Sequence, residues 1–334
     1  MEKYKLYVSG YSNDYAGIYQ VEFHPEARRF EVLSTNNETI NPIHILIKGD
    51  CLFSANEISE VGRVSSFKIE KSGALRLVNR IDGPGSGTCD ISIGDNVVYA
   101  ANYGSGNIFT VPFESDGTLI EVMSNMEHVG SEPRAHSTIL TKDKKFLYEA
   151  NLGNDRIYLY EVYPEGVLRS HSKSVSVKLD DFEGPRHMTI DSKGEYLYTV
   201  TEFGNSVYSY SINKEDGTLT FIDKIRLIEE VESYAADIHF SKDESYLYAS
   251  LRGSDEIAQI DVNNGKLKLL NKYSSGGKSP RSFKISDDGK YMFITNQVSN
   301  NVTALKVNLD DGSLSEPIAS LEINLPTSVT TYSK

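Results

Sequence analysis

A motif that recurs seven times along the chain constrains the fold more than any other feature of the sequence. Aligned on its proline or the equivalent residue, the motif starts at positions 42, 88, 133, 185, 235, 280 and 326, so successive copies lie 46, 45, 52, 50, 45 and 46 residues apart. Each copy alternates apolar runs such as "YLYTV" and "SVYSYSI" with glycine turns such as "DSKGE" and "EDGTL". Four short strands repeated at roughly 40 to 50 residues are typical of a β-propeller blade.

The two ends of the chain supply complementary parts of one repeat. The segment "YKLYVSGY" aligns with a second strand and lacks an inner strand before it, whereas "LPTSVTTY" aligns with an inner strand and lacks a second strand after it. Pairing the two segments would complete a blade and remove two open sheet edges. The sequence therefore predicts an all-β, seven-bladed propeller over residues 1–334, a single domain with four antiparallel strands per blade and one blade shared by the two ends.

Composition argues against several classes of partner. Lys and Arg number 34 and Asp and Glu 47, and the resulting net charge of −13 disfavours binding to nucleic acid or to an anionic membrane. No run approaches the roughly 20 apolar residues of a membrane span, and the N-terminus has no apolar signal core, so we expect a cytoplasmic protein. Cys51 and Cys89 lack metal-ligand spacing, and we expect neither a disulfide nor a cofactor or metal. Nothing in the sequence specifies an oligomeric state.

Two windows of each repeat are expected to meet on one face of the ring, because the start of an inner strand lies beside the end of the antiparallel strand that follows it. The start window contributes His44, Asp90, Arg134, His136, Arg186, His187, Asp237 and Arg281. The end window contributes Tyr11, Glu57, Tyr103, Leu152, Glu202, Arg252 and Gln297. We expect these side chains to surround the mouth of the central channel.

Three arginines share one column of the start window: Arg134, Arg186 and Arg281. Such a cluster suits a carboxylate or phosphate, which arginine binds through two parallel hydrogen bonds. His136 falls in a column that otherwise holds Ile45, Ile91, Met188, Ile238, Phe283 and Val329, so it is either a satisfied core histidine or a functional one. For His44, Glu57, Asp90 and Asp237, solvation of strand ends and of the channel wall is a sufficient explanation.

Three segments carry a resemblance to a known family: "EGPRHMTIDSKGEYLYTVTEFGNSV", "RAHSTILTKDKKFLYEANLGNDRIYLYEV" and "SPRSFKISDDGKYMFITNQVSNNV". They resemble the seven-bladed propeller lactonases, which include bacterial propeller-type 6-phosphogluconolactonases and fungal carboxy-cis,cis-muconate cyclases. The resemblance extends over nearly the whole chain, and its most specific element is Gly-Pro-Arg-His followed by a glutamate at the end of the next strand. It implies five functional residues, which are His136, Arg186, His187, Glu202 and Arg281.

The resemblance implies metal-independent hydrolysis of a sugar lactone that carries an anionic group, with 6-phosphogluconolactone as the nearest model. Such a reaction needs a base, a donor for the oxyanion and a ligand for the anionic group. We expect His136 or His187 as the base, Glu202 as its orienting partner or an alternative base, and Arg186 with Arg281 as oxyanion and anion ligands. The further substrate-binding residues expected are Tyr103, Arg134, Arg252 and Gln297.

Two other functions fit the same residues. A lactone-forming isomerase like the carboxymuconate cyclases would use the arginines for substrate carboxylates. A propeller without catalytic activity could bind a protein or a sugar on its rim, since this fold hosts many functions. A serine-esterase mechanism lacks support, because the sequence has no Gly-x-Ser-x-Gly elbow.

Overall fold

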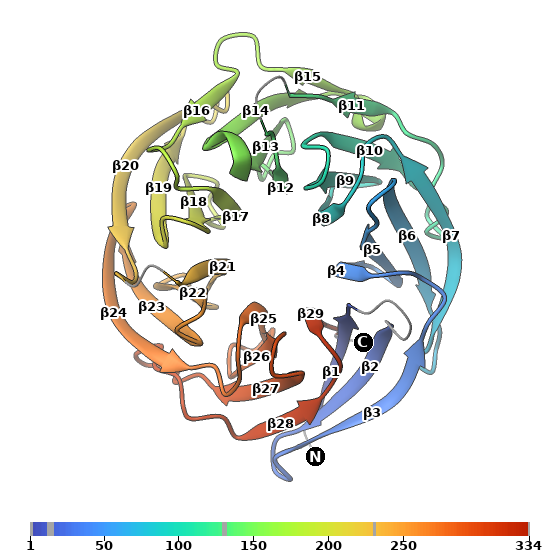
Figure 1. Cartoon of the computed structure of the whole chain (residues 1–334), viewed down its shortest axis with the longest axis vertical. Coiled ribbons are helices and arrows are strands. Elements are labelled where there is room, and N and C mark those ends of the chain that lie inside the picture. Colours follow the sequence, from blue (N-terminus) through green and yellow to red (C-terminus); the bar gives the residue numbers. More distant parts are fainter. Residues whose placement is uncertain (1–2, 12–16, 129–131, 230–231, 333–334) are drawn as a thin grey trace.

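Seven antiparallel β-sheets stand around a central channel in the computed structural model, which describes residues 3–11, 17–128, 132–229 and 232–332 (Figure 1). The first four blades comprise these strands in order from the channel outward: β29 (Pro326–Thr331), β1 (Tyr4–Gly10), β2 (Ile18–His24) and β3 (Arg29–Asn36); β4 (Pro42–Lys48), β5 (Cys51–Glu57), β6 (Gly62–Ile69) and β7 (Leu75–Gly83); β8 (Thr88–Ile93), β9 (Val97–Asn102), β10 (Ile108–Pro112) and β11 (Ser124–Met126); β12 (Ala135–Leu140), β13 (Phe146–Asn151), β14 (Arg156–Val162) and the outer pair β15 (Leu168–Ser170) and β16 (Ser176–Lys178).

The remaining three blades follow the same order: β17 (Pro185–Ile190), β18 (Tyr196–Thr201), β19 (Ser206–Ile212) and β20 (Leu219–Arg226); β21 (Tyr234–Phe240), β22 (Tyr246–Arg252), β23 (Glu256–Asn263) and β24 (Lys266–Ser274); β25 (Pro280–Ile285), β26 (Tyr291–Asn296), β27 (Asn301–Lys306) and β28 (Ala319–Glu322). The described helices are two three-residue 3-10 turns, η1 (Leu152–Asn154) and η2 (Pro164–Gly166). Among the described residues, no helix has the length and hydropathy needed to cross a membrane.

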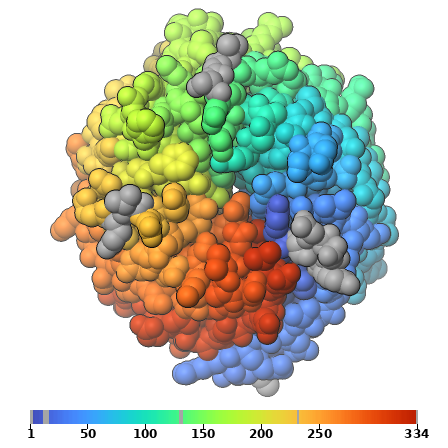
Figure 2. All heavy atoms as spheres, viewed as in Figure 1, coloured from blue at the N-terminus to red at the C-terminus, as the bar shows by residue number. Residues whose placement is uncertain are grey.

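The predicted closure of the ring is confirmed. The C-terminal strand β29 pairs antiparallel with β1, with Ser328 opposite Ser9 and Val329 opposite Val8, and becomes the inner strand of the first blade. In the fourth blade the outer position is divided between β15 and β16, which both pair with β14. A small opening remains at the centre of the ring in the space-filling view (Figure 2).

The apolar core lies between neighbouring blades, as in the cluster that joins Tyr248 and Ile257 to Phe283 and Met292. Tyrosines of several second strands also link one blade to the next. The Tyr148 hydroxyl donates to the Gly217 carbonyl at 2.6 Å, and Gly217 holds a φ of 70° in the "EDGTL" turn of the following blade. A positive φ favours glycine, so the turn sequence and the abundant tyrosines belong to one repeated contact between blades.

Every inner strand has a register irregularity near its start, where a bulged residue has no partner on the second strand; in β21 both Ala236 and Asp237 lack one. The residues at this position are Ile43, Cys89, His136, Arg186, Ala236, Arg281 and Thr327. A bulge bends the strand and changes the direction of its side chain. The bulges therefore set which side chains of the inner strands face the mouth of the channel.

Candidate active site

A pocket of about 210 Å³ lies on the face of the ring where inner strands begin and second strands end. Eight residues from six of the seven blades line it: Glu57, Cys89, Tyr103, His136, Arg186, Glu202, Arg252 and Arg281. The two sequence windows thus meet as predicted, and six of the nine predicted site residues line this pocket. The other three, Arg134, His187 and Gln297, lie next to it.

The bulge aligns His136 with Arg186 and Arg281, which corrects two predicted columns. Ala135 pairs with Asn151 as Pro185 pairs with Thr201, so His136 is the bulged residue of β12. His136 is therefore not in an apolar column, and Arg134 is not in the arginine column. The fourth repeat has two more residues before its inner strand than the proline alignment allowed, and only strand pairing reveals this.

Arg186 and Arg252 bind the same oxygen of Glu202. Arg186 is 2% exposed, and its Nε donates to Glu202 Oε2 at 2.9 Å while its Nη1 donates to the Ala236 carbonyl at 2.6 Å. Arg252 Nη2 lies 2.8 Å from the same carboxylate oxygen. Burial alone would raise the pKa of Glu202, but Arg252 and Arg186 lower it below its usual value. Glu202 is thus an ionised carboxylate that contacts arginines, where the sequence predicted a histidine contact or a base.

Arg281 has fewer partners than the other two arginines. Its described hydrogen bond runs from Nη1 to Gln297 Oε1 at a long 3.5 Å. Burial and the neighbouring Arg186 lower the pKa of Arg281, and the same two causes lower the pKa of Arg252 to about 10. All three guanidinium groups are therefore charged at neutral pH, and Arg281 keeps most of its donors for a ligand.

His136 lies on the inner strand β12, next to the blade that carries Arg186. The side chain is 4% exposed, its ring packs edge-on against Tyr103 at 5.8 Å between centroids, and its Nδ1 is buried without a hydrogen-bond partner among the described residues. Burial, followed by the charge of Arg186, lowers the pKa of His136 well below its usual value. The imidazole is therefore neutral at neutral pH.

Glu57 and Cys89 line the pocket although the sequence did not mark them as functional. Glu57 ends β5 at the position that Glu202 holds after β18, and this shared column was the signal that could have identified it. Burial raises the pKa of Glu57, against the opposing effects of Arg281 and Arg186. Cys89 is a free, buried thiol that donates to the His136 carbonyl at 3.3 Å, and burial raises its pKa well above the usual value.

Arg134 and Gln297 do not line the pocket, but each contacts a residue that does. Arg134 Nη1 donates to the Tyr103 hydroxyl at 2.7 Å, and its guanidinium carbon lies 5.1 Å from the centre of that ring. Gln297 accepts the Arg281 hydrogen bond described above. These two side chains therefore support lining residues.

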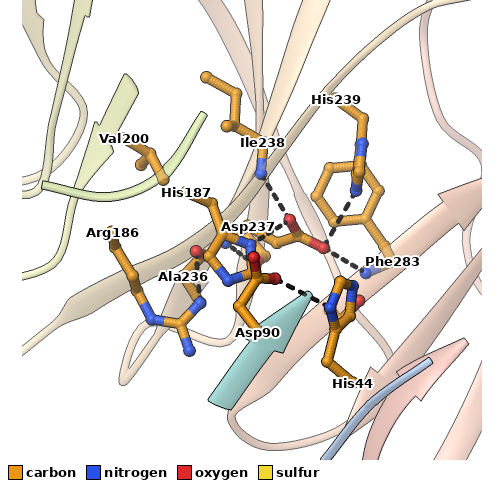
Figure 3. A network of polar contacts seen from close by, with 12 residues as sticks. His44, Asp90, Arg186, His187, Val200, Ala236, Asp237, Ile238, His239 and Phe283 are labelled. Atoms are coloured by element: carbon orange, nitrogen blue, oxygen red, sulfur yellow. Dashed lines mark hydrogen bonds and ion pairs between the residues drawn. The ribbon is translucent and has the colours of Figure 1, made fainter. Parts of the chain in front are cut away.

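His187 belongs to a group of polar residues in the channel, the channel cluster, which consists of His44, Asp90, His187 and Asp237 (Figure 3). His187 Nδ1 lies 2.8 Å from Asp237 Oδ1, and His44 Nδ1 lies 2.8 Å from Asp90 Oδ1. The ring centroid of His187 is 5.3 Å from that of His136 and 6.3 Å from that of His44. Of the arrangements that the sequence left open, a His187 oriented by Glu202 is not the one observed, because His187 Nδ1 contacts Asp237. The bulge turns consecutive residues, Arg186 and His187, toward different partners.

Comparisons with known proteins identify the family of this chain. The chain matches the family described as "Lactonase, 7-bladed beta-propeller" over residues 5–331. It is 28% identical to the 6-phosphogluconolactonase of Bacillus subtilis, with 98% of each chain covered, and 27% identical to that of Formosa agariphila, with 92% of this chain and 93% of the relative covered.

Solved structures give the same result for the fold. A Bacteroides fragilis protein that carries a 6-phosphogluconolactonase assignment superposes with a TM-score of 0.93 at 27% identity, covering 99% of this chain and 98% of its own. The periplasmic gluconolactonase of Pseudomonas aeruginosa superposes with a TM-score of 0.91 at 23% identity, over 99% of each chain, which concerns the fold alone. With the family match over nearly its full length, the chain belongs to the seven-bladed β-propeller lactonase family.

Proposed function

We propose that this protein hydrolyses a sugar lactone with an anionic substituent, with 6-phosphogluconolactone as the first substrate to test. The observation that carries the proposal is the pocket, which combines three charged arginines with a neutral histidine in a chain of net charge −13. Two curated relatives that match over nearly the whole chain are named for this activity.

The arginines can bind the two negatively charged groups of the reaction, the substrate phosphate and the oxyanion. Arg281 has unused donors that can bind the phosphate of the substrate or the oxyanion that forms when water attacks the carbonyl carbon. Arg186 and Arg252 are held by Glu202 and keep this half of the pocket positive. Glu202 positions the two guanidinium groups, since both contact its Oε2.

Among the three predicted bases, His136 is the one that lines the pocket without a described hydrogen-bond partner. His187 is bound to Asp237, and Glu202 is bound to two arginines, whereas the His136 ring lines the pocket and has no hydrogen bond to a described residue. We therefore place His136 beside the lactone carbonyl. The carboxymuconate-cyclase reaction would use the same arginines for carboxylates, so the first assay includes that substrate class.

A pH-stat assay of the full-length protein tests the proposal. Each hydrolysed lactone yields an acid, so base consumption follows turnover directly. We expect acceleration over the spontaneous rate for 6-phosphogluconolactone, a smaller acceleration for gluconolactone, and no dependence on added EDTA. Absence of acceleration for both sugar lactones would contradict the proposed function, and lactone formation from a carboxymuconate would favour the cyclase alternative.

A further inference from the structure

Two glutamates occupy equivalent positions on opposite sides of the pocket, and their surroundings differ. Glu202 follows β18 and its carboxylate binds both Arg186 and Arg252. Glu57 ends β5, and no ion pair or hydrogen bond engages its carboxylate among the described residues. The charge of Arg281 lowers the pKa of Glu57. Arg281 is therefore a neighbour of Glu57, although the two side chains do not form a close ion pair. Both carboxylate oxygens of Glu57 are therefore without a described partner, whereas Oε2 of Glu202 is shared by two guanidinium groups.

His136 is poorly suited to accept a proton. Its ring is buried, and Arg186, His187 and Arg281 each disfavour a positive charge on it. If His136 accepted a proton, it would become a cation beside the guanidinium groups in a site of low dielectric. The electrostatic repulsion would cost free energy, and a carboxylate that accepts a proton does not have this cost. A carboxylate that accepts a proton instead loses its charge, which burial favours.

A neutral imidazole suits a different task in this pocket. Buried N–H groups without partners are rare in proteins, so the tautomer that leaves the buried Nδ1 unprotonated carries its hydrogen on Nε2. A neutral histidine that donates to a substrate carbonyl is an established pattern in enzymes whose base is a glutamate. His136 can thus polarise the lactone carbonyl together with Arg281.

We infer that Glu57 is the general base of the lactonase reaction and that His136 acts as a neutral hydrogen-bond donor to the lactone carbonyl; the inference rests on the proposed function. Glu57 removes a proton from water as the water oxygen bonds to the carbonyl carbon, and the C=O electron pair moves onto the carbonyl oxygen. When that pair returns, the bond from carbon to the ring oxygen breaks, and the ring oxygen takes the proton back from Glu57. The new carboxylic acid then ionises and releases one proton to solvent.

The sharpest variant is Glu57→Gln, which keeps the size of the side chain and removes the base. We expect kcat to fall by about 10²- to 10⁴-fold, the typical contribution of a positioned base, with little change in KM. The acid limb of the kcat/KM profile should disappear with it. Glu57→Ala should regain part of its activity when formate is added, because the small carboxylate can occupy the space that the side chain leaves. Glu60→Gln, at an exposed glutamate after the same strand, is the matched control.

Variants of His136 distinguish a glutamate base from a histidine base. Under the inference His136→Gln keeps a donor and should lose less than about tenfold in kcat while retaining the acid limb, whereas His136→Ala should lose about 10²-fold or more. Equal losses in both histidine variants, with an unchanged Glu57→Gln, would overturn the inference. An inactive wild-type protein would instead overturn the proposed function. Binding of 6-phosphogluconate by calorimetry verifies that each variant keeps a folded pocket.

Discussion

The pocket and the channel cluster share the inner strands β8 and β17, and they differ in how completely their polar groups are satisfied. Arg281 in the pocket has one long hydrogen bond to a described residue. Asp237 in the channel cluster accepts four, from His187 Nδ1, His239 Nε2 and the backbone N–H groups of Ile238 and Phe283, at 2.8 to 3.2 Å (Figure 3). A satisfied network stabilises the ring, whereas unsatisfied groups at its mouth are available to a ligand.

The bulge produces this difference within two residues. Arg186 is the bulged residue and lines the pocket, while His187 directly after it pairs with the inner strand of the next blade. We therefore expect substitutions at bulged positions to change turnover and substitutions one residue later to change stability.

Among the variants that compare the pocket with the channel cluster, Arg281→Ala should have the largest effect on activity. Loss of one donor to a developing oxyanion typically costs about 2.7 to 4 kcal/mol, so we expect kcat/KM to fall by about 10²- to 10³-fold. The free energy of unfolding should change little, because the one hydrogen bond of Arg281 to a described residue is the 3.5 Å bond to Gln297. Steady-state kinetics and urea unfolding measure the two quantities. Arg76→Ala, at an exposed surface ion pair, is the control, and a large stability loss in Arg281→Ala would show that the pocket arginines are structural.

The channel cluster should show the reverse. Asp237→Ala removes the acceptor of two buried backbone N–H groups, each worth about 1 to 3 kcal/mol, so we expect the free energy of unfolding to fall by about 3 kcal/mol or more. The kcat of the folded fraction should stay within a few fold of wild type. Asp181→Ala, which removes an exposed partner of Lys178, should cost less than about 1 kcal/mol in urea unfolding. A loss of kcat without a loss of stability would place Asp237 in the catalytic machinery.

On acidification, activity and stability should decline at different pH values, because activity depends on the pocket and stability on the channel cluster. Burial raises the pKa of Glu57 above 4.5, so turnover that needs the ionised carboxylate should decline at a pH above that value. Burial alone would also raise the pKa of Asp237, but His239 and His187 hold it well below 3.8. A depressed pKa in the folded state contributes stability that is present above 3.8 and lost as pH falls below it. Parallel series of kcat/KM and urea unfolding should therefore show activity declining first, and coincident declines would contradict the distinction.

The sequence predicted the ring and the face that holds the pocket because both depend on features that repeat. The period, the incomplete repeats at the two ends and the alternation of strands specify seven blades and bring strand starts and ends together. The sequence alignment placed His136 in the wrong column because the fourth repeat has two additional residues before its inner strand. The pairing of Ala135 with Asn151 gives the correct alignment, and it is visible only in the structure. The difference between Glu57 and Glu202 depends on guanidiniums of Arg186 and Arg252 from two blades, and equivalent sequence positions do not specify such partners.

The smallest expected effect concerns Arg134, which lies outside the pocket lining and supports Tyr103 from behind. Its side chain is 39% exposed and also pairs with Glu132, so solvent screens its charge and an interaction of about 0.2 to 1 kcal/mol is expected. Arg134→Ala should therefore raise KM for 6-phosphogluconolactone by no more than about fivefold and leave kcat unchanged. Gluconolactone, which lacks the phosphate, should show no change in KM if Arg134 acts by charge, and the same change if it acts only by holding Tyr103. Arg134→Lys distinguishes these further, since lysine keeps the charge but loses the planar contact with the tyrosine ring.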